Sequence, residues 1–216
     1  MRRLSGEKAR EIMEAGRRVI FREGIWSTTT RKIAEEAGIS LATIHYYFAN
    51  KDDLVVAVYE DMIDTIRHSA AKDFAEPGTL VERIKGVVDR TWEFSQQNMA
   101  GQLMQAELTV YALRNGLRPL AVRQGREYLD IYLRVLNSAS DVASRPDLDI
   151  DGLAQLLLAG IDGILLAHLV EPDDKRTARG FERLVEVALH FPLTQGRKPI
   201  TPSTLKGSRA QTKRDR

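Results

Sequence analysis

Apolar residues recur at every third or fourth position along most of this chain, which is the spacing of one face of an α-helix. No run of alternating β-branched residues bounded by turns predicts a strand. The pattern instead predicts long helices over residues 7–23, 52–74, 80–97, 99–115, 117–142, 153–170 and 173–191, with two short helices between residues 29 and 48. We therefore expect an all-α fold of about nine helices.

The two short helices are joined by a tight turn. Thr29 and Ser40 are good N-caps for the first and second helix, because a hydroxyl oxygen can accept a backbone N–H there. Gly38 lies between them, where a left-handed backbone would penalise a Cβ. Ala34 is small, which lets the helices cross closely, and apolar contacts come from Ile33, Ala37, Ile39, Ile44 and Phe48. These features predict a DNA-binding helix-turn-helix within an N-terminal three-helix domain.

The second short helix is the predicted recognition helix. Small residues at its start let it enter a major groove, where Leu41 or Ala42 can touch a thymine methyl and Thr43 a base edge. Polar groups at residues 45–47 and at Lys51 can reach phosphates, although part of Tyr47 and all of Phe48 are expected in the core. The predicted DNA-contacting residues are Thr29, Arg31, Ser40, Leu41, Ala42, Thr43, His45, Tyr46, Tyr47 and Lys51.

Residues 10–59 resemble the N-terminal signature of TetR-family regulators in both residue type and spacing. The matching positions are Ile12, Ala15, Val19, Ile20, Gly24, Thr29, Ile33, Ala34, the run from Ala37 to Ser40, the run from Thr43 to Phe48, Lys51 and Leu54. His45 stands where the family often has tyrosine, and Lys32 where an acidic residue often completes the cap. The resemblance implies a homodimer whose recognition helices bind one palindromic operator in double-stranded DNA.

The resemblance also implies a small-molecule effector site within the fifth to eighth helices. Its candidate residues are Trp92, Met104, Glu107, Tyr111, Tyr128, Tyr132, Asp162 and His168. The methionine and aromatic positions are equally compatible with an ordinary core. Asp162 is the exception, because an acid in an apolar helix is costly unless it is paired, hydrogen-bonded or solvated. It can meet His168, an arginine across an interface, or a polar ligand.

The last two long helices are the predicted dimer interface. One short recognition helix makes few base contacts, so a dimer is also expected on physical grounds. The predicted apolar surface contains Leu153, Leu156, Leu157, Gly160, Ile161 and Ile164, with Gly163 allowing close approach, and a matching stripe of Leu184, Val187, Ala188 and Phe191. The alternative is that these residues form the core of a single chain.

Charge divides the chain into three parts. Residues 1–51 carry ten Lys/Arg against six Asp/Glu, residues 52–195 fifteen against twenty-three, and residues 196–216 seven against one. We expect a DNA-binding domain over 1–51, a helical ligand-binding and dimerisation domain over 52–195, and a disordered basic tail over 196–216. The tail either keeps the protein soluble or strengthens DNA binding at low salt.

Several protein classes are not expected. The chain has no cysteine, its four histidines are scattered, and it has neither a Gly-rich phosphate loop nor a nucleophile elbow, so no enzyme, metal site or cofactor is predicted. No signal peptide is apparent, and residues 153–170 contain polar Gln155, Asp162 and His168, so we predict a cytoplasmic protein without a membrane span. The predicted function is a ligand-released transcriptional repressor; the alternative is an architectural or partner-binding DNA-binding protein without a ligand.

Overall fold

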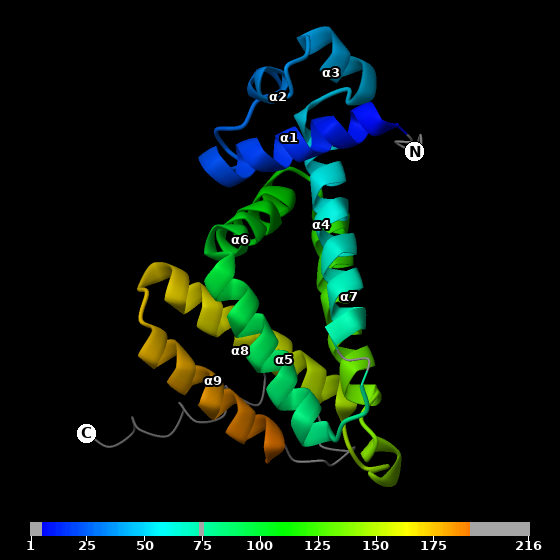
Figure 1. The fold of residues 1–216 in the computed structure, drawn as a ribbon, viewed down its shortest axis with the longest axis vertical. Helices are drawn as coiled ribbons and strands as arrows, with labels where there is room; N and C mark the ends of the chain where they lie inside the picture. The colour runs from blue at the N-terminus through cyan, green and yellow to red at the C-terminus, as the bar shows by residue number, and fades with distance from the viewer. Residues whose placement is uncertain (1–5, 74–75, 191–216) are drawn as a thin grey trace, which may run out of the picture.

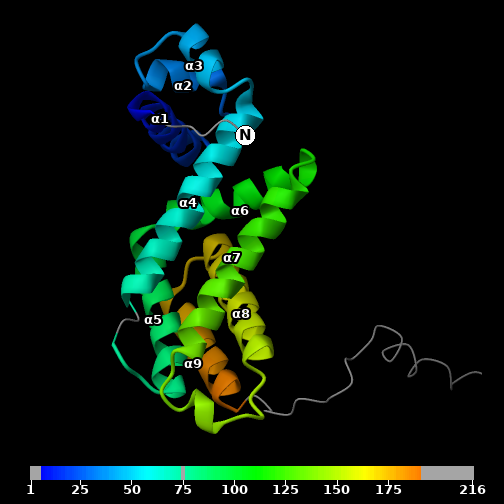
Figure 2. The same cartoon turned by 90° about the vertical axis from the view of Figure 1, so that its right-hand side faces the viewer.

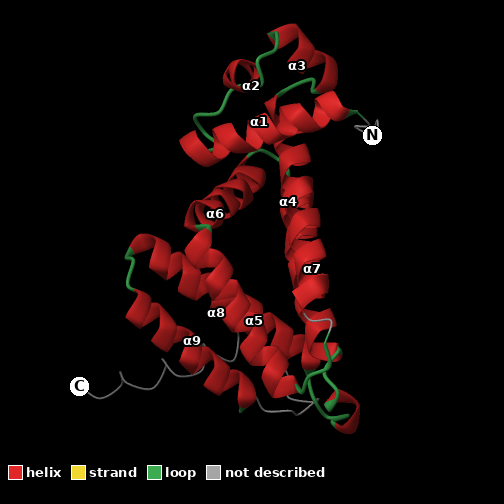
Figure 3. Cartoon of the chain, viewed as in Figure 1, coloured by secondary structure: helices red, strands yellow, loops and turns green. Residues whose placement is uncertain are grey.

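The computed structural model describes residues 6–73 and 76–190. Within these ranges the chain has nine α-helices, one short 3-10 helix (η1) and no strand, which confirms the all-α prediction (Figure 3). The helices are α1 (Glu7–Glu23), α2 (Thr30–Glu36), α3 (Leu41–Tyr47), α4 (Lys51–Asp73), α5 (Leu80–Gln97), α6 (Met99–Arg114), α7 (Arg118–Asn137), η1 (Val142–Ser144), α8 (Ile150–Val170) and α9 (Asp174–Leu189). The predicted basic tail and Phe191 lie outside the described residues.

Two helix ends differ from the prediction because of local capping. α8 begins three residues earlier than expected, since the Asp149 side chain accepts a hydrogen bond from the backbone N–H of Gly152 at 2.9 Å. α7 ends at Asn137 rather than at residue 142, since Asn137 and Ser138 turn back to donate to helix carbonyls at 2.8 and 2.7 Å. The backbone N–H of Ser140 then donates to Gly78 O at 2.8 Å, which draws the chain towards the start of α5.

The helices form two regions joined by α4 and α6. Helices α1, α2 and α3 lie at one end of the molecule, while α5, α8 and α9 lie towards the other end, and α4 runs between them (Figures 1 and 2). Two clusters of buried apolar side chains hold these regions. The first core cluster joins α1–α3 to α4 and α6, and the second joins α5, α7, α8 and α9. Leu54, Val55 and Tyr59 of α4 belong to the first cluster, so this cluster extends across the predicted domain boundary at residue 52. The boundary itself stays a prediction.

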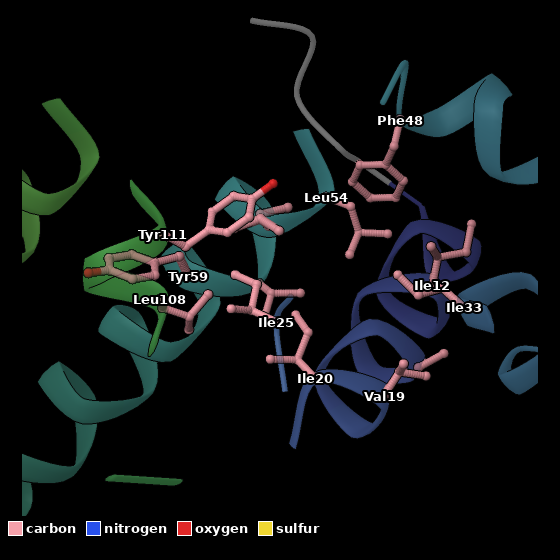
Figure 4. Close-up of a cluster of buried hydrophobic side chains, with 14 of the residues drawn as sticks. Ile12, Val19, Ile20, Ile25, Ile33, Phe48, Leu54, Tyr59, Leu108 and Tyr111 are labelled. Atoms are coloured by element: carbon pink, nitrogen blue, oxygen red, sulfur yellow. The ribbon is translucent and has the colours of Figure 1, made fainter. Parts of the chain in front are cut away.

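The first core cluster fixes the three N-terminal helices on the rest of the chain. In Figure 4, Ile12 of α1 lies beside Ile33 and near Phe48 and Leu54, while Leu108 of α6 approaches from the opposite side. All five side chains are at most 2% exposed. Burying a large aliphatic or aromatic side chain contributes about 1.5–3 kcal/mol. This cluster therefore holds the N-terminal helices firmly against α4 and α6.

Helix α8 lies against α7 and α9, and most of its predicted dimer stripe is used inside the single chain. Leu153, Leu157 and Ile161 are at most 1% exposed, and a Cβ on Gly160 would lie 2.5 Å from Leu184 of α9. This corrects the predicted interface surface, because these residues are buried in the second core cluster of the single chain. Among the described helices, α8 alone is long and apolar enough, by length and composition, to span a membrane. The core helix of a soluble protein meets the same criterion.

Candidate nucleic-acid interface and effector region

The turn between α2 and α3 has the predicted backbone geometry. The Thr29 and Ser40 hydroxyls accept from the backbone N–H groups of Lys32 and Thr43 at 3.2 and 3.1 Å, so both N-caps are confirmed. Gly38 has φ +64°, in the left-handed region that favours glycine. The N–H of the next residue donates to Ala34 O at 3.0 Å and closes the turn. The turn therefore holds α3 at a fixed angle to α2.

Ion pairs fix α2 on α1. Arg18 and Arg22 both bind the Glu36 carboxylate, at 2.8 and 2.9 Å, and the hydrogen bond from Arg18 is the main cause of the lowered Glu36 pKa. Lys32 donates to Glu23 at 2.7 Å and to Ser27 O at 2.9 Å. The family departure at Lys32 therefore has a structural use: its ammonium ties α2 to the end of α1.

Helix α3 presents its predicted contact residues at the end of the molecule. Ser40, Ala42, His45 and Tyr46 are exposed, with Tyr46 80% accessible. The other predicted residues of this helix, Leu41, Thr43 and Tyr47, are half-buried, and Thr29 and Arg31 are exposed beside them on α2. Phe48 is in the core, as expected. The arrangement places polar and small side chains where α3 can meet a groove, and their DNA contacts remain predictions.

Lys51, predicted as a phosphate contact, has partners within the chain. Its ammonium donates to Ile25 O at 2.6 Å and lies 5.1 Å from the centre of the Tyr111 ring. Burial lowers the Lys51 pKa, since a desolvated ammonium is less stable. The side chain therefore ties the start of α4 to the loop after α1, and its phosphate contact stays a prediction.

Glu107 and Tyr111, predicted as effector residues, join α6 to the N-terminal helices, and their contact with an effector stays a prediction. The Glu107 carboxylate accepts from the backbone N–H of Ile25 at 3.1 Å, next to Gly24, whose φ is +77°. Tyr111 donates to the Asp52 carboxylate at 2.5 Å, and its ring lies 5.0 Å from that of Trp26. Burial and the Asp52 hydrogen bond raise the Tyr111 pKa to about 12. Each of these contacts joins residues more than fifty positions apart, so helical periodicity in the sequence could not predict this junction.

Trp92 and His168 meet, but as part of the second core cluster. The Trp92 ring lies 5.2 Å from His168 and 5.7 Å from Phe181, and His168 is 6% exposed. The His168 Nδ1 atom is 2.8 Å from the Thr177 hydroxyl, and Nε2 is 3.8 Å from Asp174. This satisfied histidine is a packing residue that locks α5 and α8 to α9, and it does not pair with Asp162.

The remaining predicted residues lie near one another between α5, α7 and α8. Burial is the main cause of the raised pKa of both Tyr132 and Tyr128, and the charge of Asp162 adds to both shifts. Asp162 is open to solvent on one side, yet protein around its carboxyl raises its own pKa. No hydrogen bond to Asp162 is found among the described residues. Nearby, Gln124 bridges Tyr128 to Tyr59 of α4.

A groove of about 660 Å³ lies between α1 and the corner where α5 meets α6. Of the predicted effector residues, only Met104 lines it. Arg17, Phe21 and Phe94 also line it and were missed by the sequence analysis. The available signal was weak: Phe21 and Phe94 are apolar residues that lie outside the buried stripes of α1 and α5. Among the described residues no cluster of three potential metal ligands is found.

The capped helix-turn-helix at one end of an all-helical body defines a DNA-binding transcriptional regulator. A sequence profile for "Bacterial regulatory proteins, tetR family" matches residues 12–58, and a "Tetracyclin repressor-like, C-terminal domain" profile matches residues 75–190. The chain therefore belongs to the TetR family, whose members are transcriptional regulators rather than enzymes. This confirms the family resemblance and the prediction that the chain is not an enzyme.

Curated relatives match over most of their length. The chain is 25% identical over 189 residues to the nicotine-responsive transcriptional repressor HdnoR of Paenarthrobacter nicotinovorans, covering 88% of this chain and 97% of that protein. It is 28% identical to the transcriptional regulator BetI of Brucella anthropi, covering 79% and 86%. Among solved structures, the fatty acid degradation regulator FadR of Bacillus halodurans has the same fold, with a TM-score of 0.68 at 20% identity over 86% of this chain and 96% of that one.

Proposed function

We propose that this protein is a dimeric, ligand-released repressor of the cytoplasm that binds a palindromic operator through α3. The observation that carries the proposal is the exposed face of α3, held by two capped helix starts and a glycine turn at the end of the molecule (Figure 1). Ala42 and Tyr46 on this face are open to contact with a major groove and its phosphates. The dimer brings two such helices to adjacent turns of DNA.

A route for the ligand signal is provided by α6. This helix lines the groove with Met104, holds the loop after α1 through Glu107, and binds the start of α4 through Tyr111. A ligand that binds more tightly to one position of α6 favours the conformation of the protein in which the N-terminal helices have moved with α6. Relatives support a ligand in general: HdnoR is named as nicotine-responsive, and a FadR structure from Bacillus subtilis at 19% identity contains stearoyl-CoA.

The direct test is binding of the full-length protein to the DNA that flanks its own gene. Fluorescence anisotropy with overlapping duplexes is expected to find one fragment with a palindromic site, bound far more tightly than a scrambled duplex of the same composition. Affinity for both duplexes falls as salt rises, because phosphate contacts release counterions. Equal affinity for the site and the scrambled duplex, at every flanking fragment, would contradict an operator-binding function.

Replacing Thr43 by alanine tests sequence recognition. In the free protein the Thr43 and Ser40 hydroxyls are 2.9 Å apart, and rotation of the Thr43 hydroxyl allows it to meet a base edge. We expect a loss of about 1–3 kcal/mol for the operator and altered preference at one base position. Anisotropy against a set of single-base operator variants measures this. If the variant ranks all operators as the parent does, Thr43 makes no base contact.

Replacing Glu107 by alanine tests the junction. Ile25 is fully buried, and its N–H would lose its acceptor, so we expect a loss of about 1–3 kcal/mol in unfolding free energy. Denaturant unfolding measures the change. Glu107→Gln keeps an acceptor and is expected to recover part of it, while Glu93→Ala, at an exposed position of α5, is the matched control. Equal effects at 107 and 93 would show that the junction hydrogen bond contributes nothing.

A further inference from the structure

The groove between α1 and the α5–α6 corner combines exposed aromatic side chains with cations. The lining residues that matter here are Arg17, Arg18, Phe21 and Arg22 of α1, Met62 of α4, Phe94 of α5 and Met104 of α6. Its volume of about 660 Å³ lies within the range of small-molecule sites. Phe21 and Phe94, which both line the groove, are large apolar side chains that stay 48% and 51% exposed.

The charge of the groove is positive. No acidic residue is among the described residues that line it. Arg18 pairs with Glu36, and Arg22 pairs with both Glu36 and Glu23. Lys32 also pairs with Glu23, so three cations share two carboxylates at this edge of the groove. Arg17 is exposed and has no ion-pair partner among the described residues. An anionic group entering the groove therefore meets the guanidinium of Arg17, which has no carboxylate partner, and guanidinium groups suit carboxylates and phosphates.

The floor of the groove is apolar. Met104 is buried at 6% exposure, Met62 is half-buried, and the rings of Phe21 and Phe94 form exposed apolar walls. Methionine adapts to irregular apolar ligands, and covering the exposed ring surface with a ligand is favourable because it removes apolar area from water. The groove thus offers an apolar surface to a chain or ring system and a cationic rim to an anionic head.

Two other occupants do not fit. Operator DNA meets α3, which lies on the far side of α1 from α6 in both views of the fold (Figures 1 and 2). The chain's own C-terminal segment, residues 196–216, carries seven Lys/Arg and one acidic residue, so its charge has the same sign as the rim. Charge complementarity favours a small anionic molecule instead.

We propose that this groove binds an anionic amphiphile, with its apolar part against Phe21, Phe94 and Met104 and its acidic head at Arg17. An occupant there touches α1 and α6 at once, so it lies across the contact that sets the position of the DNA-binding helices. The consequence for operator release rests on the proposed repressor function. The binding itself does not, and it is measured without DNA.

The test uses the full-length protein and two probes that share one apolar chain and differ in charge. Isothermal titration calorimetry compares dodecanoate with dodecylammonium, both below the concentrations at which they form micelles. We expect dodecanoate to bind and dodecylammonium to bind at least tenfold more weakly. Arg17→Glu is expected to weaken dodecanoate binding about tenfold or more, since a charged hydrogen bond is replaced by repulsion. Phe94→Ala is expected to weaken it several-fold by removing an apolar wall.

The control is Arg126→Glu, which changes another exposed arginine beside apolar side chains, on α7. It is expected to leave the dodecanoate affinity within a factor of two. Thermal unfolding of each variant checks that these surface changes leave the fold intact. The proposal is overturned if dodecanoate does not bind, if Arg17→Glu and Arg126→Glu have equal effects, or if dodecylammonium binds as tightly. If the parent protein does not bind an operator, the repressor function is contradicted, while the dodecanoate binding result is unaffected.

Discussion

Replacing Ala42 by glutamate is expected to reduce operator affinity by about a thousandfold while the protein stays folded. Ala42 is exposed on α3, one residue after the helix starts, where a side chain faces the predicted groove. A carboxylate there would meet the phosphates and the acceptor-rich base edges, and like charges placed together at an interface cost several kcal/mol. Anisotropy with the flanking-DNA fragment measures the loss, and circular dichroism measures the helix content.

Ala143→Glu provides the matched control for this change. Ala143 is also exposed and is also replaced by an acid, but it lies in η1, after α7, at the opposite end of the molecule from α3 (Figure 1). The control is expected to keep the affinity of the parent within a small factor. Retention of tight operator binding by Ala42→Glu would mean that DNA meets another surface of the protein.

The helix-turn-helix was predictable because its signals are local. The N-caps at Thr29 and Ser40 and the glycine turn at Gly38 each depend on residues within four positions of one another, and the structure has all three. Family spacing added the identity of the domain but not the use of Lys32, whose partner Glu23 lies on the preceding helix. Local chemistry thus fixed the motif, and tertiary contacts fixed its attachment.

The effector region was not predictable to the same depth, because its contacts join distant residues. Glu107 binds a backbone N–H 82 positions earlier in the chain, and no periodic pattern distinguishes it from a solvated surface acid. Leu184 covers Gly160 in the same way, so a stripe expected between two chains is used within one. Helical periodicity identifies an apolar face without identifying what that face meets.

Helix α6 carries the contacts that a ligand can use. Within two helical turns it has Met104 in the groove, Glu107 at the loop after α1, and Tyr111 at the start of α4. The Thr109 hydroxyl, between them, bonds to Gln124 of α7 at 3.1 Å. Because these contacts belong to one helix, we expect a shift of α6 at the groove to be passed to the N-terminal helices. Under the proposed function, α6 rather than an isolated side chain is therefore the element through which we expect a ligand to act.

The dimer prediction now depends on residues that the single chain leaves open. Leu166 and Val170 of α8 are 56% and 81% exposed, and Val187 of α9 is 54% exposed. Gly163 has no atom within 4 Å of the place where a Cβ would stand, so a second helix can approach closely there. Exposed apolar side chains on a protein surface can mark an interface. We propose that this surface, instead of the buried stripe, joins two copies.

Leu166→Glu is expected to convert the dimer into a monomer of the 24.3 kDa chain. In a two-fold interface the change introduces a carboxylate from each copy into the same apolar surface, where uncompensated charges are strongly destabilising. A monomer contacts only one half-site, so operator affinity falls by orders of magnitude, although α3 itself is unchanged. Light scattering after size exclusion measures the mass. Leu113→Glu, at a 45%-exposed leucine of α6, keeps the dimer if the interface is specific. A Leu166→Glu protein that remains dimeric and binds its operator would place the interface elsewhere.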